Sequence, residues 1–165
     1  MMNGRVFLVF LLCLHGSPAS AQNPFPGGTD SLCRKGEDIY FSCPLENGKT
    51  VSICARNNTS PRDGYVRYEY GSKESRFVYP REDGPPGEKI TVTDVSEGSI
   101  RGLHFKFSVG PYTYVVSSVW PGQLYVSRRG TIVFEKTCLA SAYKSFPSDV
   151  FDGISQVPAS EIDAH

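Results

Sequence analysis

Four cysteines are the residues of this sequence whose number and spacing most clearly indicate chemistry. Cys33, Cys43, Cys54 and Cys138 follow a fifth, Cys13, which lies in an N-terminal apolar stretch. An even number of cysteines in an oxidising compartment predicts two disulfides. A zinc site is disfavoured because no C-x-x-C pair occurs. We therefore expect structural disulfides, with no metal, no cofactor and no reactive thiol.

Cys43 and Cys54 flank a predicted β-hairpin. The Asn-Gly pair at 47–48 is typical of a two-residue turn between two strands. If this pair forms the turn, Cys43 faces Ser52 and Phe41 faces Cys54. Both cysteines of the hairpin would then lie on one face of the sheet.

The pairing of the cysteines has three open connectivities. The pairing that we expect joins Cys43 to Cys138, which ties the first strand to the last, and Cys33 to Cys54. A bridge from Cys138 to the N-terminal region closes a loop longer than about 80 residues, which is worth roughly 4 kcal/mol in the chain-entropy account.

His104 is the first candidate for a general base, because the other histidines lie at positions 15 and 165. A catalytic histidine needs a nucleophile and an orienting carboxylate close by. The alternation of residues 103–107 instead places His104 on an outward face beside Lys106. We therefore expect a surface histidine without a catalytic role.

Acidic residues gather weakly in two places, at Glu82-Asp83 and at Asp94 and Glu97. A glycosidase needs two carboxyl groups about 5–10 Å apart across a cleft. Both places lie in turn-like sequence, so solvated loop charges are expected. The chain also has no GxSxG, P-loop or GxGxxG motif. No catalytic, cofactor-binding or metal-binding residue is assigned.

Aromatic residues are abundant in the middle of the chain: Tyr65, Tyr68, Tyr70, Phe77, Tyr79, Phe105, Phe107, Tyr112, Tyr114, Trp120 and Tyr125. Core packing explains most of them, although aromatic side chains also supply contact area at binding surfaces. Basic residues accompany them: Arg62, Arg67, Lys73, Arg76 and Arg81. A groove for an acidic glycan, a protein or a nucleic acid is one interpretation. An ordinary mixed surface is favoured, because 17 basic and 17 acidic residues balance.

The N-terminal residues have the order of a secretory signal peptide. Arg5 precedes the apolar stretch Val6–Leu14, and the small-x-small site Ala19–Ala21 follows, which predicts cleavage before Gln22. As a helix the apolar stretch rises about 14 Å, under half of a hydrocarbon core of about 30 Å. We therefore predict an exported protein that is soluble in the periplasm or secreted, without a membrane span.

Short β-prone runs between turn residues dominate the middle of the chain. Alternation is clear at Val66, Tyr68 and Tyr70, which are separated by charged residues. One face of this strand should therefore be buried and the other exposed to solvent. The predicted strands span 38–43, 49–55, 64–71, 75–80, 88–95, 101–109, 112–119, 123–127 and 130–137. The predicted fold class is all-β, an antiparallel small barrel or sandwich of about eight or nine strands with two disulfides.

We divide the chain into a signal peptide (1–21), a leader (22–37), a β domain (38–138) and a mostly irregular tail (139–165). Residues 22–32, which are rich in Pro and Gly, are predicted to be loose. The last residues of the tail, SQVPASEIDAH, are predicted to be disordered. Candidate contact loops are 56–63, 82–88 and 96–100, because loops on a rigid scaffold often carry function.

Part of the chain resembles a family of small exported proteobacterial proteins. The likeness covers roughly residues 33–138. The residues that carry it are Cys33, Gly36-Glu37, Phe41-Ser42-Cys43, Gly48-Lys49, Val51-Ser52-Ile53-Cys54, Tyr65, Tyr68, Tyr70-Gly71, Phe105, Tyr112, Tyr114-Val115-Val116, Gly130 and Cys138. The resemblance implies export and a β fold, and it assigns no active-site residue.

A weaker likeness is to periplasmic inhibitors of c-type lysozyme, which are small β-barrels with a Tyr-x-Cys near the start and a Ser-Gly-rich loop that plugs the lysozyme cleft. Here Tyr40 and Cys43 are separated by two residues instead of one, and the nearest loop is Ser96–Ser99. This resemblance implies lysozyme inhibition as a function to test, and no residue role is transferred from it.

The favoured function is a non-catalytic binding or inhibitory module outside the cytoplasm, with a protein or a cell-wall glycan as partner. Two alternatives stay open. One is an envelope hydrolase built around His104 or an acidic pair, and the other is a structural accessory subunit of an envelope complex. The balanced charge provides no field that would attract nucleic acid.

Overall fold

The computed structural model describes residues 30–139 and 143–165. The predicted signal peptide and the first part of the leader lie outside the described residues. Each of the nine predicted strands is present. Their bounds are β1 Asp38–Pro44, β2 Thr50–Arg56, β3 Tyr65–Gly71, β4 Arg76–Tyr79, β5 Ile90–Asp94, β6 Leu103–Val109, β7 Tyr112–Ser117, β8 Gln123–Arg128 and β9 Thr131–Thr137. The all-β fold class is confirmed.

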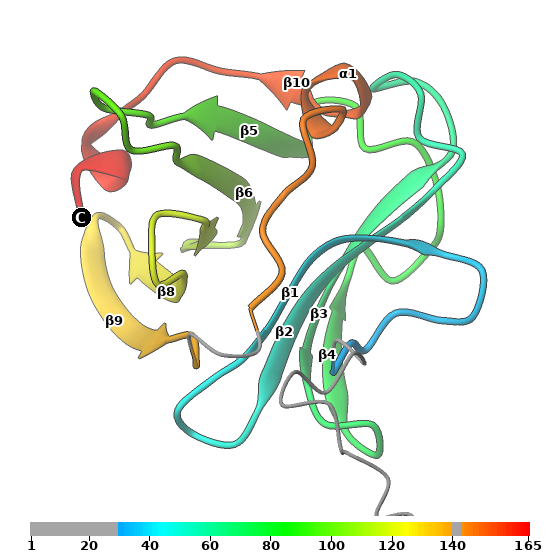
Figure 1. Cartoon of the computed structure of the whole chain (residues 1–165), viewed down its shortest axis with the longest axis horizontal. Helices are drawn as coiled ribbons and strands as arrows, with labels where there is room; N and C mark the ends of the chain where they lie inside the picture. The colour runs from blue at the N-terminus through cyan, green and yellow to red at the C-terminus, as the bar shows by residue number, and fades with distance from the viewer. Residues whose placement is uncertain (1–29, 140–142) are drawn as a thin grey trace, which may run out of the picture.

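The strands form two sheets that face each other across one core (Figure 1). One sheet has the order β1-β2-β3-β4, and the other has the order β10-β5-β6-β7-β8-β9. All neighbouring strands are antiparallel except β10 (Ser155–Gln156), which runs parallel to β5. Within the described part of the chain, no helix has the length and apolar character needed to cross a membrane.

The inward faces of both sheets supply the core. Its side chains come from strands that are distant in sequence, and fully buried examples are Phe41, Val51, Ile53, Tyr68, Ile90, Phe105, Val116 and Leu124. The period of two that separates these residues along each strand is the pattern that predicted the strands. The alternation therefore identifies the core face of each sheet correctly.

The segment that follows β9 joins the two sheets at one side. Cys138 forms an isolated antiparallel bridge with Leu45, and Lys144 forms another with Ser42 of β1. The disulfide Cys43–Cys138 lies at the same place, and the second disulfide is Cys33–Cys54. The expected pairing of the four cysteines is confirmed.

The β1–β2 hairpin has a longer loop than predicted. Leu45 N donates to Lys49 O at 2.7 Å, and Gly48 N donates to Leu45 O at 2.9 Å. The loop therefore contains three residues, Glu46–Gly48, and Gly48 has φ of +75°. A three-residue hairpin loop of this kind places glycine in the left-handed region, where it has no Cβ to clash.

This extra loop residue shifts the hairpin register by one position. Cys43 pairs with Val51 instead of Ser52, and Cys54 pairs with Ile39 next to an irregularity in β1. Cys43 belongs to the core, whereas Cys54 lies on the opposite face of β2 beside Ser52. The prediction that the two cysteines share a face is therefore wrong, because a one-residue slip reverses every side chain.

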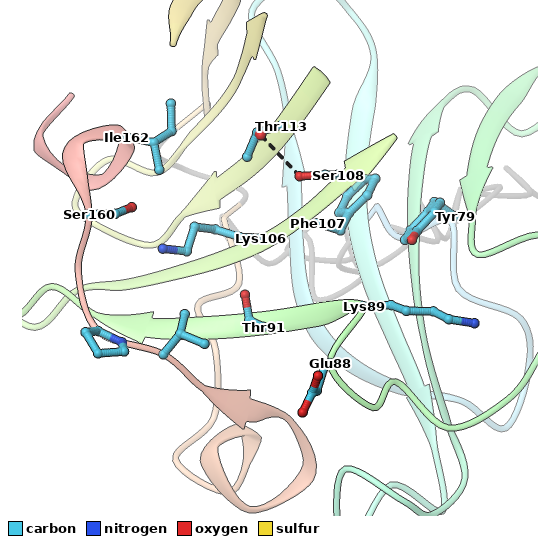
Figure 2. A pocket seen from close by; sticks show the side chains of 12 residues that line it. Tyr79, Glu88, Lys89, Thr91, Lys106, Phe107, Ser108, Thr113, Ser160 and Ile162 are labelled. Atoms are coloured by element: carbon cyan, nitrogen blue, oxygen red, sulfur yellow. Dashed lines mark hydrogen bonds between the residues drawn. The ribbon is translucent and has the colours of Figure 1, made fainter. Parts of the chain in front are cut away.

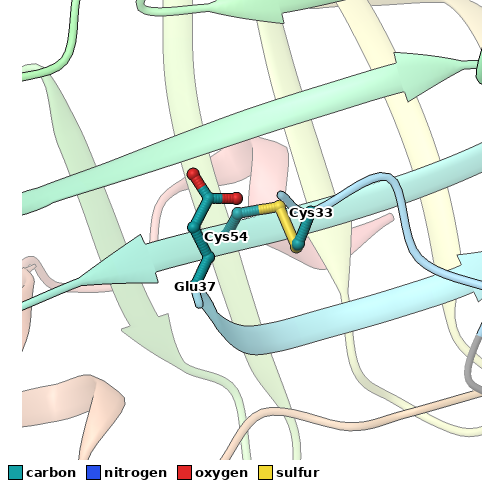
Figure 3. A group of neighbouring side chains, drawn as sticks. All are labelled: Cys33, Glu37 and Cys54. Carbon is teal, nitrogen blue, oxygen red and sulfur yellow. A yellow bond between two sulfur atoms is a disulfide. The ribbon is translucent and has the colours of Figure 1, made fainter. Parts of the chain in front are cut away.

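Residues 30–37, here called the N-terminal cover, pack on the outer face of the four-stranded sheet. The disulfide from Cys33 to Cys54 anchors them (Figure 3). Leu32 is buried, and its backbone N–H donates to Ser52 Oγ at 3.1 Å. Ser42 Oγ donates to Asp30 O at 2.8 Å. The prediction that residues 22–32 are loose is therefore wrong for residues 30–32.

Residues 155–165, here called the C-terminal cover, pack on the six-stranded sheet after the short helix α1 (Val150–Gly153). The cover contains β10 and the 3₁₀ helix η2 (Glu161–Ala164). Val157 N donates to Val92 O at 2.9 Å, and Tyr125 Oη donates to Ile162 O at 2.9 Å. The prediction of disorder for these residues is wrong, because long-range contacts order them.

Candidate functional site

His104 is buried beneath the C-terminal cover instead of lying at the surface. It does occupy the outward face of β6, as predicted, but η2 lies over it. His104 Nδ1 donates to Asp163 Oδ1 at 2.9 Å, and Lys106 Nζ donates to Asp163 Oδ2 at 2.6 Å. Ser160 also donates to Asp163 through its backbone N–H and its hydroxyl. The carboxylate of Asp163 is therefore satisfied on both oxygens.

The charge state of this cluster follows from burial and hydrogen bonding. Burial lowers the pKa of His104, although the nearby Asp163 carboxylate opposes this. For Asp163 burial acts to raise the pKa, but hydrogen bonds from Lys106 and His104 outweigh it and hold the pKa below its usual value. At neutral pH a neutral imidazole thus donates from Nδ1 to a carboxylate. Its Nε2 then carries a lone pair, which is the state of a general base.

Two hydroxyl residues are cross-strand partners of His104, Thr93 on β5 and Ser117 on β7. Thr93 Oγ1 donates to Val157 O at 3.1 Å, whereas Ser117 lines the same pocket as His104. Ser117 Oγ accepts a hydrogen bond from Val119 N at 3.2 Å. In residues 30–139 and 143–165, no hydrogen bond joins Ser117 to His104. Ser117 Oγ is therefore not aligned as a nucleophile toward this base.

The two acidic places singled out from the sequence make contacts of different range, long-range at Asp83 and local at Asp94. Asp83 forms ion pairs with Arg67 at 2.9 Å and with Arg34 at 3.1 Å. Asp94 Oδ1 accepts the backbone N–H of Ser96 at 2.9 Å. These are the contacts of structural and turn carboxylates, although Glu97 also lines a pocket together with Asp163.

Arg67 is the centre of a buried ionic cluster under the N-terminal cover. Its guanidinium nitrogens lie 2.6 Å from Glu37, 2.7 Å from Glu69 and 2.9 Å from Asp83, and the side chains of Arg67, Glu37 and Glu69 are each 1% exposed. Arg76 Nε lies 2.9 Å from the other oxygen of Glu69 without good hydrogen-bond geometry. Two of the basic residues considered for a binding groove are therefore neutralised by carboxylates.

Cys33, Glu37 and Cys54 bring two sulfur atoms and a carboxylate oxygen within 4.8 Å of one another. Figure 3 shows that the two sulfur atoms are joined. Metal-binding cysteine is a thiolate, so these sulfurs are not ligands while the disulfide stands. Glu37 instead accepts hydrogen bonds from Arg67 and from Tyr65 Oη at 2.7 Å.

A depression of about 600 Å³ lies where the C-terminal cover meets β5, β6 and β7 (Figure 2). Lys106 reaches it from β6, and Ser160 and Ile162 border it from the cover. The Ser108 and Thr113 hydroxyls bond to each other at 3.1 Å. Lys106 is already paired with Asp163, and Glu88 and Lys89 add one charge of each sign to the lining, so this depression has no excess of either charge.

A different groove, of about 350 Å³, is lined almost entirely by apolar and aromatic side chains. Here it is called the aromatic groove, and it lies between the β3–β4 hairpin and strands β7, β8 and β9. Its lining residues are Tyr68, Tyr70, Phe77, Tyr112, Tyr114, Leu124, Val126, Val133 and Phe134. Five of these nine residues are among the aromatics singled out from the sequence, and the two from β9 are not.

Ring contacts hold the walls of the aromatic groove in place. Phe77 stacks on Tyr114 with ring centroids 5.6 Å apart, and Tyr70 meets Phe134 edge to face at 5.9 Å. Each contact joins one sheet to the other. Val133 on β9 remains 53% exposed, so the groove is open to solvent with a preformed shape.

The predicted contact loops do not border the aromatic groove. The loop 56–63 is instead pinned to the C-terminal part of the chain, where Asn58 Nδ2 donates to Gly153 O at 2.8 Å. Tyr40 Oη donates to Asn58 at 3.2 Å, and burial together with Asp149 raises the pKa of Tyr40 to about 12. This loop is thus part of the packed structure.

Comparisons with protein-family models, with curated proteins and with solved structures found no match to this chain. The candidate site therefore depends on the geometry described above.

Proposed function

We propose that the chain is an exported, non-catalytic binding module whose aromatic groove contacts the partner. The observation that carries this proposal is an open groove lined by nine apolar or aromatic residues on a disulfide-linked scaffold. Exposed apolar surface of this kind commonly marks an interaction site. The signal-like N-terminus and the two disulfides support a location outside the cytoplasm.

The ionisable residues support binding more than catalysis. Arg67 and Asp163 are each satisfied by several partners, and Ser117 is bonded to the backbone. A groove held by ring stacking is ordered before the partner arrives, so little conformational entropy is lost on binding. We therefore expect the groove to recognise a complementary apolar surface on a protein or a cell-wall glycan.

The test compares two exposed apolar residues of similar size. Val133→Asp places a charge in the aromatic groove, while Ile100→Asp places one on a loop away from it; the two parent side chains are 53% and 57% exposed. Wild-type protein should retain a partner from periplasmic extract or bind purified peptidoglycan. The Ile100→Asp variant should keep this binding, whereas the Val133→Asp variant should lose it. Equal retention by both variants, or no reproducible partner, would refute the proposal.

Inhibition of c-type lysozyme is the most specific form of this proposal, and it comes from the weaker resemblance given above. Purified protein should slow the lysis of lysozyme-sensitive cells, and the Val133→Asp variant should lose the effect. Unchanged lysis at a large excess of protein would remove lysozyme as the partner.

A hydrolase is the second candidate, because His104 donates from Nδ1 to Asp163 at 2.9 Å beside a pocket. It predicts that the protein releases soluble fragments from peptidoglycan and that His104→Ala abolishes the release. The control is His165→Ala, which changes a half-exposed histidine that lines the same pocket. Absence of soluble fragments with wild-type protein would eliminate this candidate.

A further inference from the structure

Trp120 is the only tryptophan in the sequence, and at 67% exposure it is the most exposed large apolar side chain in the described ranges 30–139 and 143–165. Its indole meets the ring of Tyr143 edge to face, with centroids 6.2 Å apart. Tyr143 Oη in turn donates to Ser118 O at 2.6 Å. A solvent-exposed indole held in one orientation is typical of a binding residue, because it offers contact area without losing rotamer freedom.

The loop that carries Trp120 joins β7 to β8 and is fixed to the Cys43–Cys138 disulfide. Gly122 N donates to Val119 O at 2.7 Å, and Cys138 N donates to Gly122 O at 2.9 Å. Gly122 has φ of +90°, and a Cβ there would lie 2.7 Å from Cys138 Sγ and from the Tyr143 ring. Only glycine fits this position, so the loop is held in one conformation.

A pocket of about 300 Å³ opens beside the indole and shares no lining residue with the aromatic groove. Hydroxyl and amide groups of Ser117, Gln123 and Thr137 line it, together with the carboxylates of Glu97 and Asp163. Its volume lies at the lower end of the range for small-molecule sites, which is about 300–1,000 Å³. The pocket therefore combines one flat apolar surface with several hydrogen-bonding groups.

We propose that this Trp120 pocket binds one neutral pyranose ring of a saccharide. A pyranose has a face of C–H groups that can lie on an indole, whose π electrons make its face negative, and a rim of hydroxyls that match the polar lining. Glu97 disfavours an acidic sugar by charge repulsion, whereas Asp163 is already paired with Lys106. A quaternary ammonium ligand is disfavoured because a single indole does not form the aromatic cage that such cations require.

The single tryptophan supplies a direct test of the proposal. Its fluorescence is followed while the full chain, without the predicted signal peptide, is titrated with N-acetylglucosamine and with glucuronic acid. N-acetylglucosamine should give a saturable change with Kd on the order of 1 mM, and glucuronic acid should bind at least about tenfold more weakly. No saturable change with N-acetylglucosamine, or equal binding of glucuronic acid, would overturn the proposal.

Substitutions separate the pocket from the rest of the surface. Trp120→Ala should weaken N-acetylglucosamine binding at least about tenfold, as a lost aromatic anchor does, whereas Trp120→Phe should retain it. Binding is measured by saturation-transfer NMR, because both variants lack the single tryptophan. Ile100→Ala and Val133→Asp should bind as the wild type does. Unchanged binding by Trp120→Ala overturns the proposal, and the result for Val133→Asp keeps it separate from the aromatic groove.

Discussion

At Arg67, three carboxylates surround one guanidinium that is 1% exposed. Burying these charges costs solvation free energy, and the cost is offset only while every partner stays in place. The same logic holds at Asp163, which accepts hydrogen bonds from His104, Lys106 and Ser160. Each cluster therefore links a terminal segment of the chain to the outer face of a sheet.

Removing Arg67 should be far more harmful than removing an exposed cation. Arg67→Ala leaves Glu37 and Glu69 buried without their partner and should lower the free energy of unfolding by about 3–5 kcal/mol. Lys136→Ala breaks an ion pair with Glu46 whose side chains are 35% and 52% exposed, and it should cost less than about 1 kcal/mol. Urea unfolding at pH 7 measures both values, and similar losses would contradict this assignment.

The sequence predicted which residues face outward but not that they are buried. Arg67 and His104 both occupy positions that alternate with core residues, and alternation alone reports only the two faces of a strand. Burial of an outward face depends on a segment far away in sequence, Glu37 in one case and Asp163 in the other. No local pattern contains that information.

Among the elements, strands were predictable and the covering segments were not. β-branched and aromatic residues between turn residues predict all nine strands, and they agree with the structure because local preference and burial coincide. The two covers have no strand or helix period over most of their length. They are ordered by a disulfide, by ion pairs and by the pairing of β10 with β5, all of which are long-range interactions.

The C-terminal cover should loosen in acid. Its contact groups are His104 and Lys106 on β6, Tyr125 on β8, and Asp163 of the cover itself, with His165 lying 3.3 Å from Glu135 of β9. The pKa of His104 and that of Asp163 both lie below their ordinary values of 6.5 and 3.8. The unfolded chain then binds more protons than the folded one as the pH falls.

The contribution of His104 to stability is therefore complete above about pH 6.5 and is lost at lower pH, followed by that of Asp163 below about pH 3.8. We expect the urea midpoint to fall between pH 7 and pH 5, and His104→Gln to remove most of this change. His165→Ala is the control and should keep it. A urea midpoint that rises between pH 7 and pH 5 would contradict the predicted direction of the pH dependence.

At the scale of the whole molecule, the two disulfides contribute unequally to stability. Cys43–Cys138 spans 95 residues and joins the two sheets, while Cys33–Cys54 spans 21 and attaches the N-terminal cover. In the chain-entropy account the longer loop stabilises more, by about 1 kcal/mol. The first bridge also belongs to the core, so its loss removes packing as well.

The Cys43→Ala, Cys138→Ala double variant should therefore unfold at a lower urea concentration than the Cys33→Ala, Cys54→Ala double variant. Denaturation followed by circular dichroism measures both midpoints. Thiol titration of the wild-type protein should find no free sulfhydryl in the mature chain. If the Cys33→Ala, Cys54→Ala variant unfolded at the lower urea concentration, the disulfide of the N-terminal cover would be the more stabilising one.

The candidate sites form only when distant parts of the whole molecule pack together, and for this reason the sequence revealed only parts of them. The aromatic groove takes Tyr70 and Phe77 from one sheet and Tyr114 and Phe134 from the other. An abundance of aromatic residues was visible, but their convergence depends on how two sheets pack. The Trp120 pocket likewise combines a loop between strands with residues of the C-terminal cover.

The parallel pairing of β10 with β5 has a consequence for shortened chains. Ser155 and Gln156 occupy the edge of the six-stranded sheet, next to Thr91 and Val92. A chain cut before Ser155 would leave the backbone N–H and C=O groups of that edge without partners, and such an edge is a template for intermolecular pairing. Truncated protein should consequently self-associate more strongly than the intact chain as its concentration rises, and proteolytic loss of these few residues would promote aggregation.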